Sequence, residues 1–180
     1  METNARKTES AKLSTKETQG LRGLFESGLK DIYWTEKVLT KTLPKMAKNA
    51  NSPELVETLK NHLSETEEHV SRLEKVFETT GIKPTASRNN SVEGLLKESD
   101  NVIDLTKKGS LRDAGIIAAS QKLKHYEIAS YGTLHAYAKT LGEDKVANLL
   151  AMSLEEEKKI DAALTGIAVG SVNFNAAAMT

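Results

Sequence analysis

The chain has 180 residues, which is enough for one domain with a substantial hydrophobic core. Lys plus Arg and Asp plus Glu each number 25, so no net charge attracts nucleic acid or an anionic membrane. The absence of cysteine excludes disulfides, thiolate metal sites and cysteine nucleophiles. No run reaches the roughly 18 apolar residues of a membrane span. We therefore expect a cytoplasmic protein without nucleic-acid or membrane partners.

The N-terminal part of the chain contains a polar tail followed by two long helices. Residues 1–18 are polar and nearly free of large apolar side chains, which predicts a disordered tail. The first helix is predicted from Thr18 to Asn49, because apolar side chains recur there every three or four residues. The second helix begins after Ser52, a residue suited to capping, and ends at Gly81.

The rest of the chain predicts one short helix and two more long ones. The short amphipathic helix runs from Val92 to Lys107, and the long helices run from Leu111 to Thr140 and from Asp144 to Val169. No segment alternates with a period of two, so no sheet is expected. Short links within each half and one long crossover predict an all-α, ferritin-like four-helix bundle with a short extra helix in the crossover. We expect this domain over residues 19–172 and a flexible C-terminal tail over 173–180.

Two glutamates lie in the middle of apolar helical stripes. Glu36 and Glu127 each point in the direction of their apolar neighbours three and four residues away. They are 91 residues apart (127 − 36), and leucines of the second and fourth long helices repeat at the same interval, which indicates two similar hairpins. A carboxylate buried in a core must be protonated, paired with a cationic side chain or bound to a metal ion.

The other two long helices also carry carboxylates at mid-length, which predicts a metal site. Ferritin-like dinuclear sites take one Glu from each of two helices and a Glu-x-x-His pair from each of the other two. Glu36 and Glu127 fit the single positions. The second helix offers Glu65 with His69, and the fourth offers Glu157 with Asp161, although neither pair has the usual spacing. We predict as metal ligands Glu36, Glu65, His69, Glu127, Glu157 and Asp161.

Carboxylate ligands favour two iron or manganese ions, whose open positions could meet a small oxidant such as dioxygen or peroxide. The sequence does not identify an electron donor. The alternative is a non-catalytic helical scaffold, in which the core carboxylates are protonated or paired with lysines across the bundle. In that case His69 and the glutamates would be structural residues.

Several segments resemble one family of bacterial proteins. The run from 121 to 134, QKLKHYEIASYGTL, closely resembles the YciE/YciF group of ferritin-like stress proteins. Similar segments of that group correspond to DIYWTEK at 31–37, HLSET at 62–66 and LEEEK at 154–158. The resemblance covers about Leu21 to Val172. It implies a homodimeric bundle with a dinuclear metal site and a role in stress responses. Lys124 stands where some relatives carry an acidic residue.

Overall fold

The computed structural model describes residues 20–178 and is helical through almost all of them. The predicted tail at 1–18 lies outside the described residues. The helices are α1 (Gly20–Asn49), α2 (Pro53–Thr80), α3 (Asn90–Leu105), α4 (Ser110–Thr140) and α5 (Asp144–Ile167), followed by a π-helical segment η1 (Ala168–Val172) and a short α6 (Asn173–Ala177).

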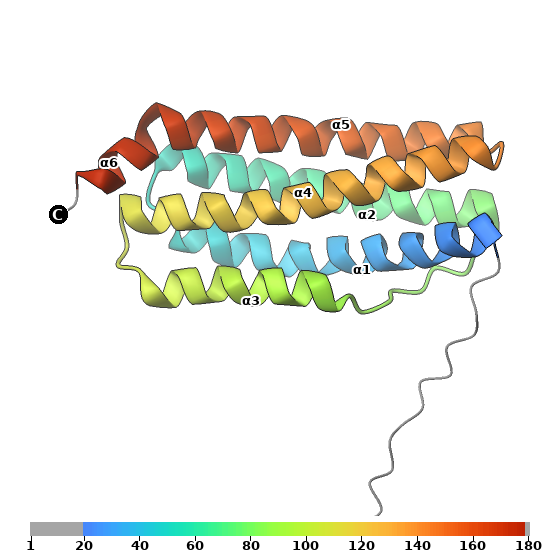
Figure 1. Cartoon of the computed structure of the whole chain (residues 1–180), viewed down its shortest axis with the longest axis horizontal. Helices are drawn as coiled ribbons and strands as arrows, with labels where there is room; N and C mark the ends of the chain where they lie inside the picture. Colours follow the sequence, from blue (N-terminus) through green and yellow to red (C-terminus); the bar gives the residue numbers. More distant parts are fainter. Residues whose placement is uncertain (1–19, 179–180) are drawn as a thin grey trace, which may run out of the picture.

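Four of the helices form the bundle. The hairpin of α1 and α2 packs against the hairpin of α4 and α5, through contacts of α2 with α5 and of α1 with α4. Helix α3 belongs to the crossover and lies along α4, with a smaller contact to α1 (Figure 1). The predicted ferritin-like four-helix bundle with an extra helix in the crossover is therefore confirmed. No helix in the described range is long and apolar enough to cross a membrane.

The start of α2 is fixed by two acceptors from different parts of the chain. The Ser52 hydroxyl accepts the backbone N–H of Leu55, as expected for a helix cap. The buried carboxylate of Asp113, on α4, accepts the backbone N–H groups of Asn51 and Ser52 at 2.7 and 2.8 Å. This pair of bonds joins the α1–α2 turn to the first turn of α4.

Helix α3 packs closely on α4 because of a glycine. A Cβ atom at Gly115 would collide with the side chain of Val102 on α3, so the glycine allows the two helices to approach. The next residue of α3, Ile103, is buried in the apolar core, whereas Leu105 at the end of α3 is 85% exposed.

The C-terminal segment continues as helix beyond the predicted bundle boundary. Helix α5 passes into η1, where the buried side chain of Val172 joins the apolar core, and then into α6. The predicted flexible tail at 173–180 thus contains five helical residues, Asn173–Ala177, none of them buried.

Candidate metal centre

A polar layer crosses the bundle at mid-length, between two apolar clusters. On α1, Ile32 belongs to one cluster and Leu39 to the other, and Glu36 lies between them. The same order of apolar, polar and apolar residues occurs on the other three bundle helices. The buried polar residues in this layer are Glu36, His62, Thr66, His69, Lys124, Glu127, Ser153 and Glu157. All four bundle helices therefore contribute buried polar side chains to one layer at the same depth of the bundle.

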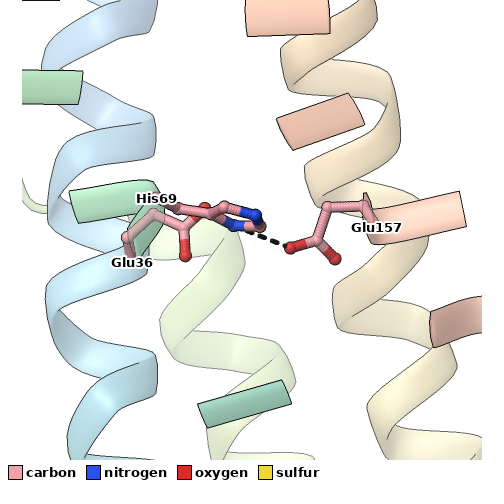
Figure 2. A group of neighbouring side chains, drawn as sticks. All are labelled: Glu36, His69 and Glu157. Carbon is pink, nitrogen blue, oxygen red and sulfur yellow. Dashed lines mark hydrogen bonds and ion pairs between the residues drawn. The ribbon is translucent and has the colours of Figure 1, made fainter. Parts of the chain in front are cut away.

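One group of ligand atoms joins α1, α2 and α5. Glu36, His69 and Glu157 are all buried and place one ligand atom each within 4.8 Å of the others (Figure 2). His69 Nδ1 lies 3.2 Å from Glu36 Oε1 and 3.2 Å from Glu157 Oε1. One imidazole nitrogen and two carboxylates form a ligand set that suits iron or manganese.

A second group shares Glu157 with the first. Ligand atoms of His62, Glu127 and Glu157 also lie within 4.8 Å of one another, and all three residues are buried. A carboxylate that belongs to two neighbouring groups is in the position of a bridging ligand. The two groups together describe places for two adjacent cations.

The ammonium group of Lys124 lies within the second group. Its side chain is 1% exposed, and Nζ lies 2.5 Å from Glu127 Oε2. The same nitrogen contacts Glu157 Oε2 and His62 Nε2. A cationic side chain therefore already neutralises part of the charge of the core carboxylates.

The close charges change the pKa values of these groups in opposite directions. Burial alone would lower the pKa of His69, but its contacts with Glu157 and Glu36 outweigh this effect and raise it to about 10. Burial would raise the pKa of Glu157, yet Lys124 and His69 lower it to about 2. Burial and the neighbouring Glu157 raise the pKa of Glu127 well above its ordinary value. In the absence of a metal ion, these shifts favour the cationic form of His69 and the ionised form of Glu157.

Polar side chains around the first group fix the orientation of its ligands. The Tyr131 hydroxyl donates to Glu36 Oε1 at 2.6 Å. On the opposite side of the imidazole, His69 Nε2 lies 2.8 Å from Glu156 Oε2, and Arg72 donates to the same oxygen at 2.7 Å. A carboxylate bonded to one imidazole nitrogen leaves the other nitrogen directed at the site, as in many metal-binding histidines.

Four of the six predicted ligands lie in the polar layer, and two lie outside both groups. Glu65 is only partly buried, and Asp161 pairs with the exposed His125 at 3.2 Å on the outside of the bundle. Neither supplies an atom to the two groups, because Thr66 and Glu157 hold the helical positions that face the core, and their roles as ligands stay predictions. These two residues are also 91 apart (157 − 66), so Thr66 corresponds to Glu157 in the repeat.

Three residues of the centre were not among the predicted ligands: His62, Lys124 and Tyr131. His62 lies seven residues before His69, and Lys124 lies three residues before Glu127, so each shares a helix face with a predicted ligand. Tyr131 lies four residues after Glu127. Helical spacing from the predicted ligands was the signal that could have identified all three.

Comparison with known proteins places the chain in one family. The family described as "Domain of unknown function (DUF892)" matches residues 20–177. The chain is 43% identical over 157 residues to Protein YciF of Escherichia coli strain K12, which covers 87% of this chain and 95% of that protein.

Solved structures agree with this assignment. The crystal structure of the E. coli stress protein YciF has a TM-score of 0.83 at 41% identity, covering 86% of this chain and 98% of that one. YcfI of Rhodopseudomonas palustris, described as a candidate structural protein, has a TM-score of 0.80 at 39% identity and covers 84% of this chain and 96% of its own. A Xanthomonas campestris protein at 22% identity, with a TM-score of 0.67, shares the fold.

Proposed function

We propose that this chain, which belongs to the DUF892 family, is a ferritin-like protein that binds iron or manganese in the polar layer of its bundle. The ligands of the first ion are Glu36, His69 and Glu157, with His69 bound as the neutral imidazole, so that the ion displaces its proton. The second group, which contains Glu127, sets an upper limit of two ions, as expected for a dinuclear centre. Glu65 and Asp161 are not part of this proposed ligand set.

The observation that carries the proposal is the convergence of Glu36, His69 and Glu157 from three helices, with their ligand atoms within 4.8 Å of one another. The residues present fit a metal ion in a second respect. Glu36 Oε2 and Glu127 Oε1 are buried and have no hydrogen-bond partner among the described residues. A buried carboxylate oxygen without a partner is costly, and coordination to a cation removes that cost.

Glu36, His69 and Glu157 would hold the iron or manganese ion, which would supply redox chemistry towards a small oxidant such as dioxygen or peroxide. The chain itself holds the ion through Glu36 and Glu157, orients His69 through Glu156, and excludes bulk water with the apolar clusters on both sides. The proposed role is oxidase, peroxidase or iron-handling chemistry in a stress response. We propose that the protein acts in the cytoplasm and as a homodimer. Sedimentation velocity at micromolar concentration tests the dimer.

Metal analysis of the full chain tests the proposal. Apoprotein loaded anaerobically with ferrous iron and then desalted should retain at least one ion per chain. Glu36→Ala and His69→Ala should each lose most of that iron, whereas Glu67→Ala, which removes an exposed carboxylate from α2, should keep it. Less than one ion per chain in the unsubstituted protein, with the bundle intact by circular dichroism, would overturn the proposal.

The pairing of Lys124 favours a second candidate, a non-catalytic helical scaffold. In this case Lys124 and His69 alone compensate the buried carboxylates, and metal ions have no role. The scaffold predicts that manganous or ferrous ions leave the melting temperature unchanged, and that Glu36→Leu is tolerated or stabilising. The metal centre predicts a rise in melting temperature with the ion, because a ligand that binds only the folded state stabilises it.

A further inference from the structure

We propose that Lys124 permanently occupies the second cation position of the centre, so that the chain binds one divalent metal ion, at Glu36, His69 and Glu157, instead of two. This inference rests on the proposed metal-binding function and specifies its stoichiometry. The ammonium group then acts as a built-in monovalent cation beside a single exchangeable metal ion.

The contacts of the ammonium group match the second ligand group. That group consists of His62, Glu127 and Glu157, and Lys124 Nζ contacts one atom of each. An ammonium group has three N–H donors and no acceptor. Two of these donors have hydrogen-bond acceptors in His62 Nε2 and Glu157 Oε2, and the group also forms an ion pair with Glu127. A metal ion at the same place would have to compete for these atoms and would be repelled by the nearby positive charge.

The internal repeat gives independent support. A dinuclear bundle site uses two Glu-x-x-His pairs, one on each of two helices. Here α2 has only the histidine, as Thr66-x-x-His69, and the corresponding positions of α5 have only the glutamate, as Glu157-x-x-Ile160. The histidine of one pair and the glutamate of the other together serve the first position, beside Glu36.

The second position has no nitrogen ligand from α5, and the histidine of its group, His62, comes from α2. Ile160, at the α5 position of the Glu-x-x-His histidine, is buried and belongs to an apolar cluster. Helix α4 supplies the ammonium group of Lys124, three residues before Glu127, at this position. A hydrophobic residue therefore stands where a dinuclear bundle site has a histidine, and Lys124 places a positive charge at the same depth of the bundle.

Manganous ion is a suitable probe, because its electron paramagnetic resonance spectrum distinguishes an isolated ion from an exchange-coupled pair. Chelator-treated full-length protein is titrated with Mn²⁺, and bound ions per chain are counted by equilibrium dialysis and elemental analysis. We expect one ion and an isolated six-line spectrum for the unsubstituted chain. Lys124→Ala should bind two ions with a coupled spectrum, and Lys124→Gln should also gain the second ion. The matched control is Lys122→Ala, which removes an exposed lysine of α4 and should still bind one ion.

The outcomes separate this inference from the function on which it rests. Two ions in the unsubstituted protein, or one ion in folded Lys124→Ala and Lys124→Gln, would overturn the inference and leave the metal centre standing. No ion in the unsubstituted protein would overturn the proposed function and the inference together. If neither Lys124 variant folds, the count and spectrum of the unsubstituted chain decide between one ion and two.

Discussion

Replacing Lys124 by methionine should strongly destabilise the metal-free protein. The methionine side chain has nearly the length of lysine, so the substitution removes the charge with little change in volume. The lysine side chain is 1% exposed, and its ammonium group contacts the carboxylates of Glu127 and Glu157. Removing one partner from a buried ion pair costs about 3–5 kcal/mol, because the other charge remains buried without compensation.

Domains typically have a free energy of unfolding of roughly 5–15 kcal/mol, so this loss would be a large part of the total stability. At about 2–4 °C per kcal/mol for a chain of this size, the melting temperature should fall by about 6–20 °C. Urea unfolding followed by circular dichroism, at pH 7 with chelator, measures the free energy of unfolding. Lys122→Met, which removes an exposed lysine from the same helix, should change it by less than about 1 kcal/mol.

A double-mutant cycle tests the origin of the effect. Lys124→Met combined with Glu157→Gln should be more stable than the sum of the two single losses predicts, by about 1–3 kcal/mol, because the two charges are removed together. A cooperative unfolding of Lys124→Met alone, with a free energy of unfolding within about 1 kcal/mol of that of the unsubstituted protein, would contradict this explanation. In that case the ammonium group does not compensate the carboxylates.

Three further predictions concern the pH dependence and the packing of the bundle. His69, with its pKa raised from 6.5 to about 10, should contribute its full stabilisation below pH 6.5 and lose it as the pH rises to about 10. The urea midpoint of the metal-free protein should therefore fall across this window, and less so in His69→Gln; a flat profile in the unsubstituted protein would contradict the pairing. Gly115→Ala should destabilise the protein by about 1–3 kcal/mol, because the added Cβ collides with α3. Gly94→Ala, in open space on α3, should stabilise it by about 0.5–1 kcal/mol, and equal melting temperatures for the two variants would disprove the close packing. Asp113→Ala should cost about 1–3 kcal/mol in urea unfolding, because two backbone N–H groups ahead of α2 lose their acceptor; no change would show that these bonds do not stabilise the turn.

The fold was predictable because its signals are local in the sequence. Apolar residues at helical spacing define the four long helices, and Ser52, Pro53 and Gly81 mark the ends of α2. The short links within each half then require antiparallel neighbours. The extension of helix through η1 was not predicted, because Gly170, directly after Val169, is of a type that commonly ends helices, whereas here it lies within the π-helical segment.

The site was only partly predictable. Glu36 and Glu127 stand in clear apolar stripes, and the structure buries both. On α2, the carboxylate Glu65 was preferred to Thr66 on chemical grounds, although one step along a helix turns a side chain by about 100° and Thr66 is the one that faces the core. Lys124 was recognised as a departure from some relatives but not as a central residue. A lysine usually extends its charge to water, and only the packing of four helices around it closes that route.

Anomalous diffraction from crystals grown from chelator-treated protein and soaked in Mn²⁺ tests the metal centre most directly. We predict one anomalous peak in the bundle, bounded by Glu36, His69 and Glu157, and none at the position of the Lys124 ammonium group. The absence of any peak in the polar layer after full loading would contradict the proposed metal centre. Two peaks there would contradict the assignment of the second position to Lys124.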